Sequence, residues 1–259
     1  MVFVFPMVGQ SSRFTAAGYT VPKYRLHLHD RTVFEWVLEG FRHHFDQGLF
    51  LFPHRDESDV SEFIHERAAL LGITRMQTVP IGGETLGQAD SVLLALQATA
   101  LINSEEGLVI FNIDSFRPGF VLPSFPQDSA GYLEVFHGEG AGWSFVEPDS
   151  LHPGRAIRTT EKIRISDLCC TGLYTFASVA LFVNYAERAK ACGSWKKHAK
   201  EFYVAPLYND LIADGRSVHY LTVPEDRVLF CGIPTEYEAL QSAGVRSLQA
   251  RFERYGAEK

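Results

Sequence analysis

The sequence predicts an α/β fold: a single domain with a Rossmann-like mixed sheet that is mostly parallel and has helices on both faces. Apolar runs and amphipathic segments alternate over the first 114 residues, and this alternation is typical of parallel strands joined by helices. The apolar runs are short and uninterrupted, as in strands buried on both faces. The chain has 259 residues, 46% of them hydrophobic and 21% charged, which is enough to fill one large core.

In the first half, the expected elements alternate as strand, helix, strand, helix, strand, helix and strand. Pro6 cannot donate to a sheet ladder, so the first strand is expected to end near it. Asp30 or Thr32 is a candidate cap for the first long helix, and Gly72 is the expected stop of the second. The expected strands span residues 2–8, 48–53, 74–80 and 107–112, and the expected helices span 30–44, 57–72 and 87–102.

After residue 115 the pattern changes to shorter strands, typical of mixed or antiparallel pairing. The runs at 130–136, 142–148, 155–162 and 171–176 are expected strands and form a smaller β insertion. Helices are expected over about 178–192 and 201–213, a strand over 217–224, and one C-terminal helix over about 234–255. No repeat or linker is evident, so we predict one domain over 1–259, with halves of about 1–115 and 116–259.

The composition argues against several kinds of partner and location. The formal net charge is −7 and the pI about 5.8, which disfavours nucleic acid or an anionic membrane as the main partner. No apolar run approaches the ~18 to 20 residues of a membrane span, and no secretory signal is expected, so the expected location is cytoplasmic. The oligomeric state is left open, a homo-oligomer included. The four cysteines form no CxxC pair and are expected to be buried thiols: Cys169, Cys170, Cys192 and Cys231.

The stretch "FPMVGQSSRFTAAGYTVPKY", residues 5–24, ends the first apolar run in small polar residues and then adds two cations. Backbone N–H groups in such a loop form a concavity that binds phosphate. Arg13 adds a planar fork suited to phosphate oxygens, and Lys23 adds a point charge. The spacing matches neither a P-loop nor a dinucleotide fingerprint. The simpler interpretation is a polar turn with two surface cations.

This stretch resembles the start of the sugar-1-phosphate nucleotidyltransferases and the related small-molecule cytidylyltransferases. Their pattern is a strand, then G-x-G-[ST]-R-[LF], then P-K, with the lysine fourteen positions after the first glycine. Ser11 stands here in place of the second glycine. The positions that match in type and spacing are Gly9, Ser12, Arg13, Phe14, Pro22 and Lys23.

Later segments resemble the same family in the same order. "TLGQAD" at 85–90 resembles the base-binding segment, and "FNIDS" at 111–115 resembles the strand end whose aspartate holds the metal. A Glu-Lys pair and a T-G-[LIV]-Y-x-F strand, here at 161–176, resemble the side that binds the acceptor. "EFYVAPLYNDLIADG" at 201–215 resembles a later helix. The resemblance covers about residues 2–240.

The resemblance implies an enzyme that transfers a nucleoside monophosphate from a nucleoside triphosphate to a phosphorylated acceptor with release of pyrophosphate and Mg2+ as cofactor. The first half would bind the nucleotide and the second half the acceptor. The implied catalytic residues are Arg13 for the pyrophosphate, Lys23 for the α-phosphate and Asp114 for the metal. The implied nucleotide-binding residues are Gly9, Gln10, Ser11, Ser12, Gly87 and Gln88, and the acceptor-binding residues are Glu161, Lys162, Thr171 and Gly172.

One position departs from the family pattern. A second metal-binding aspartate usually stands two residues before a late glycine, but "LFCGIP" places Phe230 there. Asp226 or Glu225 is the alternative second ligand. Otherwise Asp114, phosphate oxygens and water hold the metal, which suits Mg2+ because it keeps several waters. In the acceptor-side strands, Trp143 and Tyr174 either line a pocket or pack in the core.

Several functions remain open from the sequence. The first is synthesis of a nucleotide sugar from a sugar 1-phosphate, for cell-surface polysaccharide. The second is cytidylyl transfer to a non-sugar phosphomonoester, such as phosphocholine or a phosphorylated amide. A glycosyltransferase is the third, although "NIDSF" lacks the D-x-D motif of that class. The fourth is a nucleotide-binding relative without catalytic activity.

Overall fold

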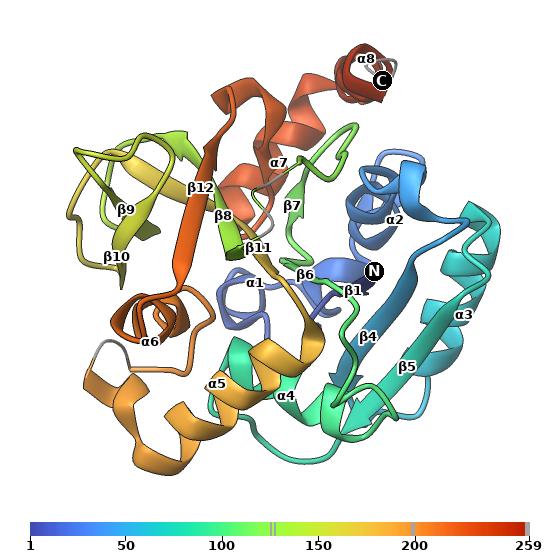
Figure 1. Ribbon diagram of the computed structural model, residues 1–259. Coiled ribbons are helices and arrows are strands. Elements are labelled where there is room, and N and C mark those ends of the chain that lie inside the picture. Colours follow the sequence, from blue (N-terminus) through green and yellow to red (C-terminus); the bar gives the residue numbers. More distant parts are fainter. Residues whose placement is uncertain (125, 127, 198–199, 257–259) are drawn as a thin grey trace.

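The computed structural model describes residues 1–124, 126, 128–197 and 200–256, and one nine-stranded mixed sheet runs through both halves of the chain (Figure 1). The α/β prediction is therefore confirmed. Along the sheet the order is β10 (Ala156–Glu161), β9 (Ser144–Pro148), β11 (Leu168–Phe176), β6 (Leu108–Phe111), β1 (Val2–Val4), β4 (Leu49–Arg55) and β5 (Met76–Ile81). Off this path, β8 (Ser129–His137) pairs with β11 and with β12 (Ser217–Thr222).

Smaller elements surround this sheet. Two short ribbons pair β2 (His27–Leu28) with β3 (Arg31–Thr32), and β7 (Ser115–Phe116) with β13 (Leu229–Phe230). The α-helices are α1 (Ser12–Ala16), α2 (Val33–Glu39), α3 (Val60–Leu71), α4 (Gln88–Gln97), α5 (Val179–Cys192), α6 (Leu207–Ala213), α7 (Pro234–Ala243) and α8 (Val245–Gly256).

The parallel strands bury both of their faces, as the apolar runs predict. Strands β6, β1, β4 and β5 pair in parallel. Because side chains alternate along a strand, Val2 and Val4 enter a core shared with α4 and α5, whereas Phe3 and Phe5 enter a second core shared with α2 and α3. Helices on both faces follow from these two cores, and the carboxyl ends of the strands are left free for a site.

The first strand ends earlier than residues 2–8. Pro6 breaks the regular ladder after Val4, although the chain stays extended and Met7 forms an isolated bridge to His54. Thr32 is the cap of α2, because its hydroxyl accepts from the Glu35 N–H while the Glu35 carboxylate accepts from the Thr32 N–H. The predicted stop of α3 after Leu71 is also confirmed.

The second half contains the predicted antiparallel strands, and two of its helices differ from the prediction. The segment 201–206 is not helical, because Phe202 exchanges backbone hydrogen bonds with Leu86 and Ala89, so α6 begins only at Leu207. The expected helix over 234–255 is two helices, since Gly244 has a φ of 81° and a ψ of 152° that interrupt the helical path.

Two further expectations concern the cysteines and membrane spans. Three of the cysteines are buried, but Cys192 lies exposed at the end of α5, so the prediction for that thiol is wrong. Within the described part of the chain, no helix is both long enough and apolar enough to cross a bilayer.

Candidate active site

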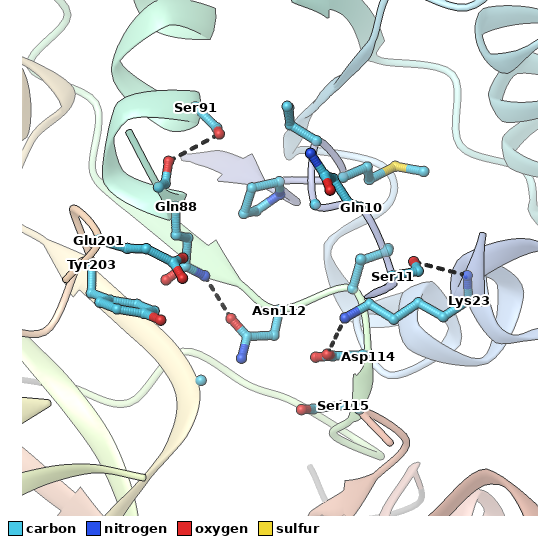
Figure 2. Close-up of a pocket in the computed structure, with 18 of the residues that line it drawn as sticks. Gln10, Ser11, Lys23, Gln88, Ser91, Asn112, Asp114, Ser115, Glu201 and Tyr203 are labelled. Atoms are coloured by element: carbon cyan, nitrogen blue, oxygen red, sulfur yellow. Dashed lines mark hydrogen bonds and ion pairs between the residues drawn. The ribbon is translucent and has the colours of Figure 1, made fainter. Parts of the chain in front are cut away.

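A cavity of about 920 Å³ lies at the carboxyl ends of β1 and β6. Parallel strands place their carboxyl ends at one edge of a sheet, which is where α/β proteins bind ligands. Segments far apart in the sequence meet here, as Figure 2 shows for the residues that it labels. The lining comes from the segments 6–13, 23–24, 83–88, 112–115, 142–144, 161–162, 170–174, 201–203 and 230–236, and from Arg55 and Ser91.

The loop after β1 contains a serine in a backbone conformation that favours glycine. Ser11 has a φ of 51°, in the left-handed region, and it precedes α1. Such a conformation costs a non-glycine residue about 1 kcal/mol. The Lys23 N–H donates to the Ser11 hydroxyl at 3.2 Å, which helps to hold this conformation and joins the two cationic parts of the loop. A Cβ built on Gly9 would meet no atom within 4 Å, so the loop leaves open space beside its backbone.

Lys23 and Asp114 meet inside the cavity. The Lys23 ammonium lies 2.5 Å from the Asp114 carboxylate, and only 21% and 19% of the two side chains are exposed (Figure 2). Arg13 lines the same cavity. The structure therefore brings together the three residues that the resemblance makes catalytic, from opposite ends of the first half of the chain.

A polar side chain that the sequence analysis did not select joins the two sides of the site. Asn112 accepts a hydrogen bond from the Gln88 amide at 2.6 Å (Figure 2). Gly172 lies against it, with a φ of +92°, and a Cβ there would come within 2.4 Å of the Asn112 amide nitrogen. Asn112 thus links the start of α4 to β11. Its position two residues before Asp114, at the end of an apolar run, was the available signal.

At the other end of the cavity lie Glu161 and Lys162. Glu161 is buried and accepts a hydrogen bond from the Ser144 hydroxyl. Burial raises the pKa of its carboxyl group, and this outweighs the lowering by Ser144 and by Lys162. The Lys162 ammonium donates to the Tyr203 hydroxyl at 2.6 Å and lies 4.6 Å from the centre of that ring. Both members of the predicted acceptor pair therefore line the cavity.

Thr171 lines the cavity but commits its hydroxyl to the protein interior. It donates to Glu134 at 3.1 Å, and the Arg117 guanidinium donates to both oxygens of the same carboxylate at 2.9 Å. Arg117 and Glu134 are 4% and 0% exposed. Burial raises the pKa of Glu134 despite the opposing charge of Arg117. This buried pair, which the sequence analysis missed, fastens the segment after Asp114 to β8 and β11.

The structure does not bring Asp226 to the cavity. Its carboxylate accepts a hydrogen bond from the Tyr255 hydroxyl at 2.6 Å and lies 3.6 Å from the Arg254 guanidinium. Both partners belong to α8, so the Asp226 side chain contacts that helix. Glu225 does not line the cavity either. Phe230 does line it, and its strand pairs with the residue after Asp114.

Another carboxylate in the lining, Glu236, was missed by the sequence analysis. It accepts from the backbone N–H groups of Gly232 and Ile233 at 2.7 and 3.2 Å and so caps the start of α7. Within the described residues, no group of three or more His, Cys, Asp or Glu side chains could hold a metal ion. Asp114 as a single carboxylate still fits Mg2+, because this ion keeps several waters and takes phosphate oxygens as ligands.

At the carboxyl ends of β1 and β6, the loop after β1, the two cations and the Asp114 carboxylate line one cavity, which is the arrangement expected for an α/β nucleotidyltransferase. No family model matches the chain, and a search of the curated proteins finds no match. Solved structures do match. The nucleoside-diphosphate-sugar pyrophosphorylase from Vibrio cholerae RC9 is 41% identical with a TM-score of 0.87, and the alignment covers 93% of this chain and 99% of that one.

Two more distant structures have the same fold. The inositol-1-phosphate CTP transferase from T. maritima is 15% identical with a TM-score of 0.66, over 93% of this chain and 94% of that chain. A UDP-glucose pyrophosphorylase complexed with UDP-glucose is 13% identical with a TM-score of 0.68, over 95% and 98%. Given the close relative from Vibrio cholerae RC9, the chain belongs to the family of nucleoside-triphosphate-dependent nucleotidyltransferases that includes the nucleoside-diphosphate-sugar pyrophosphorylases.

Proposed function

We propose that the protein transfers a nucleoside monophosphate from a nucleoside triphosphate to a sugar 1-phosphate and releases pyrophosphate. The observation that carries the proposal is the meeting of Lys23 and Asp114 in a cavity that also contains Arg13, Glu161 and Lys162. The sugar phosphate is inferred from the relatives, since two of them are described as sugar nucleotide pyrophosphorylases. We further propose that the product is a precursor of cell-surface polysaccharide and that the reaction takes place in the cytoplasm.

The central difficulty of this reaction is repulsion between two anions. The acceptor phosphate must attack the α-phosphorus of a triphosphate that carries several negative charges, so positive charge and alignment lower the barrier most. Arg13 has the fork geometry that binds two phosphoryl groups, which suits the departing pyrophosphate. The loop 9–12 offers its backbone and hydroxyl groups to the same triphosphate. Gly87 and Gln88 line the cavity at the start of α4, which supports their assignment to the base.

Lys23 has a partner in the protein and a second one in the substrate. The structure shows its ammonium on Asp114. In the reaction the Lys23 ammonium moves from Asp114 to the α-phosphate, where negative charge develops. This movement leaves the Asp114 carboxylate free. Asp114 is then the residue that would hold Mg2+, which supplies positive charge to the triphosphate when it is bound. The side chain of Lys23 thus neutralises whichever anion lies next to it.

The acceptor is proposed to enter at the opposite end of the cavity. We assign Lys162 to the acceptor phosphate and Glu161 to a hydrogen bond from an acceptor hydroxyl or amine, and the position of both residues in the cavity lining supports this. Gly172 keeps the wall beside Asn112 thin, because its missing side chain leaves room for that amide. Thr171 holds this wall to Glu134 in the core.

A second candidate is cytidylyl transfer to a phosphomonoester that is not a sugar, such as phosphocholine or a phosphorylated amide. One observation favours it. Two carboxylates, Glu161 and Glu201, lie at the acceptor end of the cavity, and a cationic head group would pair with them. The distant likeness to a CTP transferase shows the shared fold and does not choose between the acceptors.

The test is a pyrophosphate-release assay with a panel of substrates and MgCl2. Each acceptor, namely glucose 1-phosphate, inositol 1-phosphate or phosphocholine, is combined in turn with ATP, CTP, GTP, UTP and dTTP. The mass of the product is measured by mass spectrometry. We expect pyrophosphate and a nucleotide-diphospho product for a sugar phosphate. Release of a nucleoside diphosphate from a nucleotide sugar would indicate a glycosyltransferase instead. Tight nucleotide binding without turnover on any acceptor would indicate a relative without catalytic activity.

A further inference from the structure

Three aromatic rings form what we call the aromatic wall: Phe136, Trp143 and Phe230. The ring centres of Trp143 and Phe230 lie 4.6 Å apart, and Phe136 lies 5.2 and 5.3 Å from the two others. Phe136 is buried beneath them. Trp143 and Phe230 are only half-buried, and both line the cavity. The wall therefore has one member in the core and two that face the site.

The wall lies between the catalytic carboxylate and the acceptor lysine. On one side, Phe230 pairs with the residue after Asp114, and Cys231, the residue that follows β13, donates its N–H to the Asp114 carbonyl at 2.8 Å. On the other side, the Lys162 N–H donates to the Trp143 carbonyl at 2.8 Å. The indole N–H of Trp143 donates to the Glu139 carbonyl at 3.0 Å, so the edge of this ring is also held. The two rings that line the cavity therefore belong to backbone segments that contact Asp114 on one side and Lys162 on the other.

The chemistry of the wall selects what can lie against it. The face of an aromatic ring carries partial negative charge, so it repels a phosphate and attracts polarised C–H groups and cations. Phe230 stands where the family pattern has a second metal-binding aspartate. This position therefore lacks a negative charge that would repel the acceptor phosphate. Phosphate is therefore expected at the lysines, and the organic part of the acceptor at the rings.

We propose that the two rings of the aromatic wall that face the cavity, Trp143 and Phe230, determine acceptor specificity by packing against polarised C–H groups of the acceptor's organic part. The inference rests on the proposed function, because it names the surface that this function uses for its acceptor. Two sources present such groups: the C–H face of a sugar or cyclitol ring, and the N-methyl groups of a quaternary ammonium. The experiment below separates these sources.

The first measurement is fluorescence. Of the three tryptophans, Trp143 lines the cavity, whereas Trp36 and Trp195 are 2% and 9% exposed and lie outside its lining. The purified protein is titrated with glucose 1-phosphate, inositol 1-phosphate, phosphocholine and inorganic phosphate. We expect the emission to change with at least one organic phosphate and to stay constant with inorganic phosphate.

The second measurement compares affinities of variants by calorimetry. Trp143→Leu and Phe230→Leu are each expected to weaken binding of that organic phosphate about tenfold and to change the affinity for inorganic phosphate less than twofold. Phe136→Leu is the matched control, because it removes the buried ring of the same cluster. It is expected to lower the melting temperature while leaving the affinity within about twofold. A loss confined to phosphocholine identifies the ammonium, and a loss confined to the ring compounds identifies their C–H face.

Three results would overturn the proposal. The first is an equal loss of affinity for organic and inorganic phosphate in the Trp143 and Phe230 variants. The second is no loss for either. The third is a wild-type protein that binds none of the three organic phosphates more tightly than inorganic phosphate. Failure of the proposed function is distinct, since pyrophosphate release would then be absent although wall-dependent binding is present.

Discussion

Replacing Lys23 by methionine separates the two partners that we assign to this side chain. In the structure its ammonium neutralises Asp114 at 2.5 Å, and about four fifths of each side chain is buried. A hydrogen bond between charged groups is worth about 1.5 to 3 kcal/mol net. A divalent cation that binds Asp114 in the absence of nucleotide must displace this ammonium. Lys23→Met removes that competition, so the affinity of the free protein for Mg2+ should rise by roughly 10- to 100-fold.

The same change should strongly reduce catalysis. Without Lys23 the α-phosphate loses a cation where charge develops, which typically costs about 3 kcal/mol, or roughly a hundredfold in kcat. Calorimetric titration with MgCl2 in the absence of nucleotide measures the first effect, and pyrophosphate release measures the second. The opposite directions of the two effects make the prediction specific.

A matched control removes a comparable pair at the surface. Arg188 lies 2.7 Å from Asp214, but 46% and 42% of these side chains are exposed, so Arg188→Met should alter neither quantity more than about twofold, because exposed ion pairs contribute little. The reasoning would be refuted if Lys23→Met bound Mg2+ no more tightly than the wild type. Turnover that survives the loss of Lys23 would equally refute it.

Three further changes test the walls of the site and its support. Gly172→Ala should raise the KM for the nucleotide at least tenfold and lower the melting temperature, because its Cβ would clash with the Asn112 amide, which accepts a hydrogen bond from Gln88. Gly140→Ala is the control, since Gly140 also has a positive φ, of +84°, but lies in open space. It should cost only about 1 kcal/mol of backbone strain and leave the KM unchanged. The buried Glu161 has a raised pKa, so the folded protein keeps a proton that the unfolded chain releases, and stability falls as the pH rises above about 4.5; Glu161→Gln should therefore be more stable than the wild type at pH 7 but not at pH 4 in thermal melts. Arg117→Met should lose about 3 to 5 kcal/mol in urea unfolding, because it leaves the buried Glu134 carboxyl group without its ion-pair partner, and the double variant with Glu134→Leu should recover part of that loss.

Much of the fold and part of the site could be predicted from local patterns. Hydrophobic periodicity distinguishes strands from helices, and alternation of the two implies a parallel sheet. Once a parallel sheet is predicted, the location of the site follows, because the carboxyl ends of parallel strands lie at one edge of the sheet. The loop after β1 and Asp114 after β6 had to approach each other for this reason, and the contact between Lys23 and Asp114 confirms that they do.

Errors arose where nearness in sequence was taken for nearness in space. Asp226 stands four residues before Phe230, yet its carboxylate belongs to the contact with Tyr255. The short ribbon of β7 and β13 instead pairs Phe230 with Ser115, the residue that follows Asp114. The helix expected from residue 201 was wrong for a related reason, since Phe202 uses its backbone groups to bind the loop before α4.

The sequence by itself determined the order of the elements, the loop that ends β1 and the carboxylate that ends β6, because each follows from residues close together along the chain. The tertiary structure alone decided the partners of the remaining site residues. Asn112 lies against Gly172, Arg117 pairs with Glu134, and Phe230 packs on Trp143. These contacts join strands that are distant in sequence, and their register depends on how the whole sheet packs, which no local pattern encodes.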